Sequence, residues 1–119
     1  AQVSVVADVL VGLVAALHLY FLVLEMFLWT TPTGRRVFGL EPGFAQESRT
    51  LAANQGLYNG FLVAGLVWGL AADRDDVKIF FLACVVVAGV YGAATVNRRV
   101  LAVQAAPAAL ALVAVLVSR

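Results

Sequence analysis

Four long apolar runs constrain this chain more than any other feature of its sequence. They cover residues of about 5–29, 51–72, 77–96 and 100–117. The hydrocarbon core of a bilayer is about 30 Å thick, and a helix needs about 20 apolar residues to cross it. The runs reach or approach that length, and they lack the alternation of a β-barrel strand. We therefore expect an all-α fold: a polytopic membrane protein in which residues 1–119 form a single domain, an antiparallel bundle of four transmembrane helices.

The composition excludes several classes of protein. Hydrophobic residues make up 63% of the chain and charged residues 13%, whereas an ordinary soluble domain has about 45–50% and about 25%. The net charge of +1 gives no field that would attract nucleic acid. Cys84 is the single cysteine, so there is no internal disulfide and no zinc-binding pattern. The sequence also lacks a phosphate-binding glycine loop and a GxSxG motif, and we expect no metal and no nucleic acid partner.

The basic residues between the apolar runs indicate an orientation. Loops with more Lys and Arg tend to remain in the cytoplasm. Five basic residues fall on one side and three on the other: Arg35, Arg36, Arg49, Arg98 and Arg99 against Arg74, Lys78 and Arg119. We expect loops 30–50 and 97–99 in the cytoplasm and both termini outside, with the reverse or a mixed orientation left open. Loop 30–50 either lies along the membrane surface or is solvated.

Small residues recur at four-residue steps within the runs. Gly56, Gly60 and Ala64 follow this spacing in the second run, and Gly89 and Ala93 follow it in the third. Small residues four apart let membrane helices approach closely. The spacing predicts either packing inside one bundle or an interface between copies, and the number of such positions favours a homo-oligomer.

Polar side chains gather in one half of the predicted bundle. A charged side chain at the bilayer centre costs about 2.5–3.5 kcal/mol, so its presence needs a reason. His18 and Glu25 lie seven residues apart, which places them on one helix face, about 10 Å apart along the axis. When the helices alternate in direction, further polar residues fall in the same cytoplasmic half as Glu25. They are Asn54, Gln55, Tyr58, Asn59, Tyr91 and Gln104.

This one-sided polarity predicts a cytoplasm-facing pocket that binds a small, mainly apolar molecule. Glu25 is the candidate acid or base and His18 the floor of the pocket, while the other six residues are candidates for substrate binding. Histidine and a carboxyl group in apolar surroundings both titrate near neutral pH, so the two could exchange protons. The alternative is that the amides join helices and that Glu25 pairs with an arginine, which is Arg35, Arg36 or Arg98.

Three functions are compatible with such a site. The first is an isomerase or cyclase that uses acid–base chemistry and no redox cofactor. The second is a proton-coupled exporter of small molecules with Glu25 as the proton carrier. The third is a non-catalytic structural or accessory membrane subunit whose polar groups fix helix packing.

Two segments carry a resemblance to a known family. One contains His18-Leu19-Tyr20 and then LEMFLWTTP at residues 24–32, and the other is ANQGLYNGF at residues 53–61. Together they resemble the domain-of-unknown-function 1304 family of small bacterial integral membrane proteins. The resemblance implies four helices in the cell membrane, and it implies no particular activity.

Two further likenesses concern architecture. The pair Asn59-Gly60 with Tyr91 is similar to styrene oxide isomerase, a four-helix membrane enzyme whose haem iron activates an epoxide. There a histidine just before the Asn-Gly pair holds the haem, whereas this chain has Asn54 and Gln55, which are poor iron ligands. His18 would have to hold haem from another helix, so we expect no cofactor. Small multidrug transporters also combine four short helices with one glutamate in the first, without a local match around Glu25.

Overall fold

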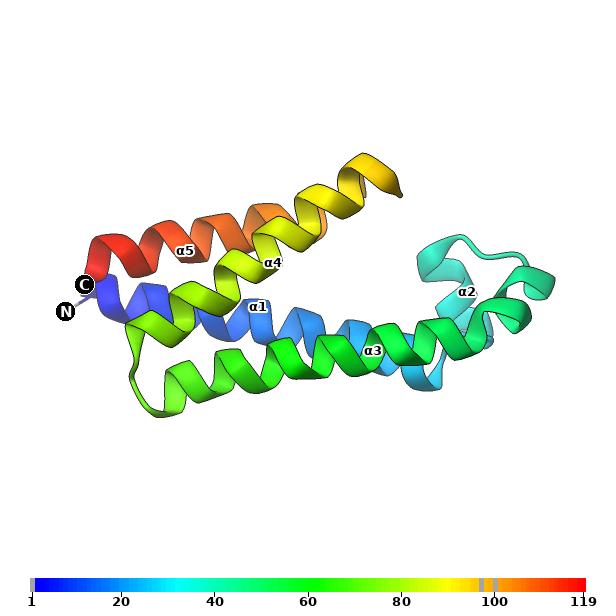
Figure 1. The fold of residues 1–119 in the computed structure, drawn as a ribbon, viewed down its shortest axis with the longest axis horizontal. Coiled ribbons are helices and arrows are strands. Elements are labelled where there is room, and N and C mark those ends of the chain that lie inside the picture. Colours follow the sequence, from blue (N-terminus) through cyan, green and yellow to red (C-terminus); the bar gives the residue numbers. More distant parts are fainter. Residues whose placement is uncertain (1, 97, 100) are drawn as a thin grey trace. The chain divides into compact units, whose positions relative to one another are not determined.

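The structure is a computed structural model that describes residues 2–96, 98–99 and 101–119, without the side chains of residues 2, 3 and 101. Every regular element in this part of the chain is a helix, as expected for the all-α class (Figure 1). In chain order they are α1 (Gln2–Phe27), α2 (Pro32–Phe38), α3 (Pro42–Ala71), α4 (Asp75–Thr95), the π-helical turn η1 (Leu101–Ala105) and α5 (Ala106–Ser118).

Two helices in the described part are long and apolar enough to cross a membrane. They are Ser4–Phe27 within α1 and the whole of α4. The segment Ala102–Ser118 is apolar but shorter. The longest helix is α3, with 30 residues, and its first half carries most of its charged and amide side chains.

The segment between the first two apolar runs is more ordered than the sequence suggested. Pro32 begins α2, and Pro42, expected in the middle of a loop, begins α3. The fixed φ angle of proline suits the first turn of a helix, where no N–H is needed. The hydroxyl of Thr31 accepts a hydrogen bond from the N–H of Gly34 at 3.3 Å and so caps α2. Gly39, with a φ angle of 65°, ends that helix in the left-handed conformation.

The described chain divides into two compact units. One consists of residues 1–16 and 64–119, and the other of residues 17–63. In the first unit α4 packs against α5 and η1. The buried apolar side chains of this unit come from all of its helices, and they include Ala7, Val11, Val14, Ala15, Leu66, Val77, Leu82, Val85, Ala105, Ala108, Ala111 and Val115.

Small residues make the closest packing in the first unit. A Cβ atom added to Gly89 of α4 would lie 2.6 Å from the Cβ of Ala105 and 2.8 Å from its backbone nitrogen. Pro107, two residues after Ala105, has no N–H for the helix ladder, and the backbone before it forms the π-helical turn η1. The bare backbone of Gly89 therefore gives η1 the room to pack directly on α4.

The second unit joins the end of α1, α2 and the first two-thirds of α3. The indole N–H of Trp29 donates a hydrogen bond to the hydroxyl of Ser48 at 3.0 Å. The ring of Trp29 also packs on Phe38 of α2, with centroids 5.0 Å apart. Leu24, Ala45 and Ala52 are buried in the same unit. One aromatic side chain, that of Trp29, therefore contacts both α2 and α3.

Candidate functional site

Glu25 of α1 and Asn59 of α3 meet inside the second unit. The Nδ2 amide of Asn59 donates a hydrogen bond to Oε1 of Glu25 at 2.5 Å. Asn59 is buried, with 6% of its surface exposed, and Glu25 is half-buried. The two residues are 34 positions apart in the sequence. The structure therefore joins two of the residues that the sequence singled out.

His18 is the most deeply buried of the predicted site residues. None of its surface is exposed, and its ring makes an edge-on contact with Phe21, with centroids 5.6 Å apart. It lies two helical turns before Glu25, a separation of about 10 Å along α1. At that distance the two side chains do not exchange a proton through one direct hydrogen bond, and a relay between them would need an intervening group.

Three other candidates on α3 lie at the surface. Asn54, Gln55 and Tyr58 are exposed, and the ring of Tyr58 packs edge-on against Phe61. At 100° per residue, Gln55 lies one turn from Asn59 on nearly the same face, whereas Asn54 lies well around the helix. Gln55 is therefore the best placed of the three to line the entrance to a site at Asn59.

The last two candidates belong to the first unit. Tyr91 on α4 is 70% exposed, beside an apolar groove formed with Phe80, Cys84 and Val87. Gln104 lies in η1 and is half-buried. Since Glu25 belongs to the second unit, the roles of Tyr91 and Gln104 at its site remain predictions.

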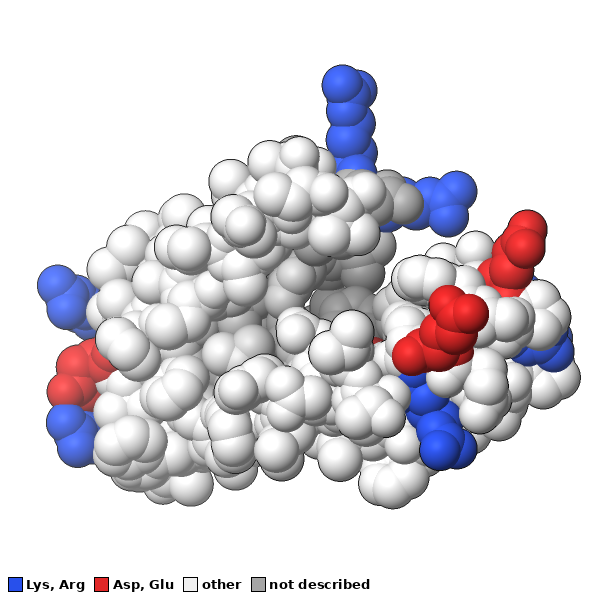
Figure 2. All heavy atoms as spheres, turned by 45° about the vertical axis from the view of Figure 1, so that its right-hand side comes forward, with Lys and Arg blue, Asp and Glu red and all other residues white. Residues whose placement is uncertain are grey.

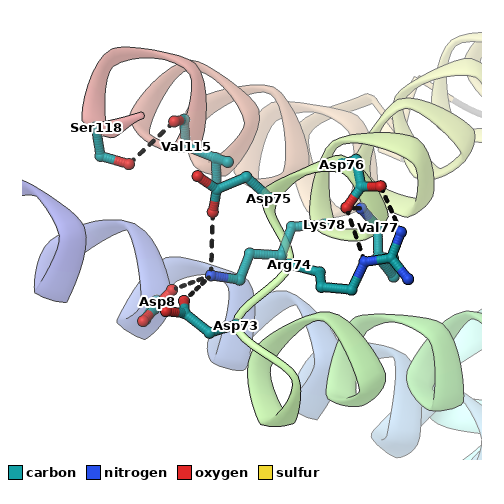
Figure 3. A network of polar contacts seen from close by, with 9 residues as sticks. All are labelled: Asp8, Asp73, Arg74, Asp75, Asp76, Val77, Lys78, Val115 and Ser118. Carbon is teal, nitrogen blue, oxygen red and sulfur yellow. Dashed lines mark hydrogen bonds and ion pairs between the residues drawn. The ribbon is translucent and has the colours of Figure 1, made fainter.

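A second polar cluster, around Lys78, was not recognised from the sequence. The Lys78 side chain is only 3% exposed, and its Nζ atom lies 2.9 Å from Asp8, 3.3 Å from Asp73 and 3.4 Å from Asp75 (Figure 3). These carboxylates come from α1, from the turn after α3 and from the first turn of α4. The three-residue spacing of Asp75 and Lys78 was a usable signal. No sequence pattern pointed to Asp8, 70 residues away.

A small polar cavity surrounds this cluster. Its volume is about 220 Å³, and residues from the start of α1 and the end of α5 complete its wall, including Ser4 and Ser118. The ammonium group of Lys78 occupies the centre of the three carboxylates. In the described part of the chain, no three His, Cys, Asp or Glu side chains are arranged to hold a metal ion.

The fold and these contacts define a class: a small all-α protein with two helices of membrane-crossing length and a carboxyl–amide pair between α1 and α3. The chain belongs to the family described as Protein of unknown function (DUF1304), whose profile matches residues 12–116. It is similar to the Uncharacterized protein YpaA of Lactococcus lactis subsp. lactis (strain IL1403). The two are 31% identical over 115 residues, which cover 92% of this chain and 96% of that protein. No solved structure matches the chain.

Proposed function

We propose that this chain is an integral protein of the cell membrane, and that Glu25 and Asn59 are the centre of an intramembrane site for a small, mainly apolar molecule. The exposed surface supports the first part. Leu13, Phe80 and Val87 are 60%, 63% and 68% exposed on helices that carry many other exposed apolar side chains. Large exposed apolar surfaces mark contact with a membrane or with another protein.

The distribution of burial and charge supports the same conclusion. Only 28% of each membrane-length window is buried, whereas the core helix of a soluble protein is mostly buried. On the face drawn in Figure 2, charged side chains gather in a few places and most of the surface is uncharged. A hydrocarbon layer would cover that uncharged surface at no electrostatic cost.

Four helices would then cross the membrane: the two candidate spans in α1 and α4, together with α3 and the segment η1–α5. The apolar part of α3, residues 51–71, is about 31 Å long, and residues 101–118 are about 27 Å long at 1.5 Å per residue. Both lengths are close to the 30 Å or so of hydrocarbon. Segment 30–50, which contains α2 and the start of α3, and loop 97–99 would face the cytoplasm. Trp29 and Phe38 beside Arg35 and Arg36 are a composition typical of the membrane interface.

One observation carries the functional part of the proposal: Glu25 has a neutral partner. In the described part of the chain Glu25 forms a hydrogen bond with Asn59 and no ion pair, so the expected alternative of pairing with Arg35 or Arg36 is not seen. A buried carboxylate that serves only structure is normally paired with a cation. An amide partner leaves the carboxyl group free to gain and lose a proton without breaking an ion pair.

The geometry suggests how this carboxyl group would act on a bound molecule. Asn59 holds Oε1, which leaves Oε2 for a hydroxyl, amine or acidic C–H group of the ligand. In an isomerisation or cyclisation, Glu25 would remove a proton from one atom and return a proton to another. Such a reaction needs no oxidant and no cofactor, and the apolar helices would hold the rest of the molecule.

The same observation favours a second candidate, proton-coupled export. A lone carboxyl group with a neutral partner can bind either a proton or a substrate, which is the requirement for a carrier. Export needs Glu25 to face each side of the membrane in turn, whereas catalysis needs only one access route. Vesicle uptake that collapses in Glu25→Gln would favour export, while conversion of the bound molecule without uptake would favour catalysis.

Identification of small molecules that copurify with the protein tests the proposal. Glu25→Gln keeps an acceptor for the Asn59 amide but cannot ionise, and Glu47→Gln removes an exposed carboxyl group from the same unit as a matched control. Both variants and the unmodified protein are extracted from their native membrane and analysed by mass spectrometry. We expect a small apolar species that accompanies the unmodified protein and Glu47→Gln and is depleted severalfold in Glu25→Gln. Equal recovery from all three would overturn the proposal and favour a purely structural role.

A further inference from the structure

We infer that Gly56 is a positioning residue for this site: its missing side chain lets α3 approach α1 closely enough for Asn59 to reach Glu25. That Gly56 allows the Glu25–Asn59 hydrogen bond is argued from geometry alone. That this hydrogen bond matters for function rests on the proposed function. The hydrogen bond joins two helices through one short amide side chain, so it tolerates little change in their spacing.

Packing distances locate the closest approach of the two helices at Gly56. A Cβ atom added there would lie 2.5 Å from Cγ of Met26, 3.2 Å from Cβ of Glu25 and 3.3 Å from the backbone oxygen of Leu22. The first distance is shorter than any ordinary contact between carbon atoms, and the others are tight. Gly56 is buried, and the Cβ of Glu25 lies close to its backbone.

The neighbouring glycine has a weaker effect, which singles out Gly56. A Cβ atom added to Gly60 would meet one atom within 4 Å, the Cδ1 of Leu22 at 3.0 Å. That atom is the end of a flexible side chain and can move aside. The contacts at Gly56 include a backbone oxygen and the Cβ of Glu25 itself, which move only when the helix moves.

The consequence is a specific pattern of loss and rescue. Gly56→Ala should push α3 away from α1 and carry the Asn59 amide out of reach of Glu25. Glutamine is one methylene longer than asparagine, so Asn59→Gln should span the wider gap. A glycine that mattered only for general packing would not be rescued by lengthening an amide side chain elsewhere.

A double-mutant cycle between Glu25→Ala and Asn59→Ala, read as melting temperatures in detergent, tests the inference. In the unmodified background the two losses should be non-additive, because each variant breaks the same hydrogen bond. In the Gly56→Ala background they should become additive. In Gly56→Ala with Asn59→Gln, coupling to Glu25 should return. Gly12→Ala is the matched control, since a Cβ there meets no atom within 4 Å, and coupling should persist in it.

Undiminished coupling between Glu25 and Asn59 in Gly56→Ala would overturn the inference, as would a failure of Asn59→Gln to restore it. If Gly56→Ala does not fold, adding Met26→Ala removes the nearest clashing atom and should restore the fold, whereas the contacts with Leu22 and Glu25 remain and should keep the coupling weak. A refolded protein with undiminished coupling would also overturn the inference. The melting temperatures do not depend on a ligand, whereas the copurification experiment does. Either the proposed function or the positioning role of Gly56 can therefore be refuted while the other stands.

Discussion

Lys78 shows at the residue scale how one charge is accommodated in an apolar helix. Its ammonium group has three carboxylate partners, and its side-chain stem lies against Gly69 of α3, where a Cβ would be 2.8 Å from Cγ of Lys78. The partners differ in exposure. The Asp8 side chain is 46% exposed, Asp75 39% and Asp73 86%. Hydrogen bonds to a buried charge contribute more to stability than ion pairs made in water.

The difference in exposure predicts which partner of Lys78 contributes more to stability. Asp8→Asn should lower the free energy of unfolding by about 1–2 kcal/mol, because Asp8 makes the closest contact and belongs to another helix. Asp73→Asn should cost less than about 0.5 kcal/mol, because its carboxylate remains largely hydrated. Thermal unfolding in detergent compares the two variants. Equal losses, or a larger loss for Asp73→Asn, would contradict the role given to Asp8.

The candidate site shows what residue patterns can and cannot predict. Glu25 and Asn59 stood out from the sequence because polar groups are costly in apolar runs, and that cost is a local property. Their contact depends on which faces of α1 and α3 meet. The glycine spacing left open whether those faces pack inside one bundle or against another copy. Asn54 and Tyr58 carry equally polar groups, yet they are exposed. The sequence pattern alone did not separate them from Asn59.

At the scale of elements, each of the four apolar runs coincides with helical structure in α1, α3, α4 and η1–α5, and two of these helices are long and apolar enough to cross a membrane. The boundaries were less accurate. The seven residues of α2 were not predicted, since their stability comes from the Thr31 cap, Gly39 and contacts with Trp29 rather than from an apolar pattern. Pro32 and Pro42 were interpreted as breaks, whereas each begins a helix.

The close packing between α4 and η1 can be tested at Gly89, where the two elements touch. Gly89→Val should lower the free energy of unfolding by about 1–3 kcal/mol, because the added side chain would overlap the backbone of Ala105. Gly12→Val in α1 is the control, as its position has open space around it. Melting temperatures of the two variants provide the measurement. A Gly89→Val protein as stable as Gly12→Val would show that η1 does not pack on α4.

At the scale of the whole molecule, the account depends on the path of the chain through the membrane. With Cys84 replaced by alanine, single cysteines at positions 36 and 75 should react with a membrane-impermeant reagent from opposite sides. Position 36 should react only from the cytoplasm, because segments 30–50 and 97–99 together carry five of the eight Lys and Arg residues. Labelling of both positions from one side would contradict the four-span topology. Labelling of each from both sides would indicate dual insertion.

The central claim is that Glu25 is a protonatable carboxyl group within the membrane. The most direct measurement is modification of the protein in its native membrane by a hydrophobic carbodiimide, which reacts with protonated carboxyl groups in apolar surroundings, followed by peptide mass spectrometry. The account predicts an adduct at Glu25, none at the exposed Glu47, and the reverse preference for a water-soluble carbodiimide. An unmodified Glu25 under the hydrophobic reagent, or equal modification of Glu25 and Glu47 by the water-soluble one, would contradict it.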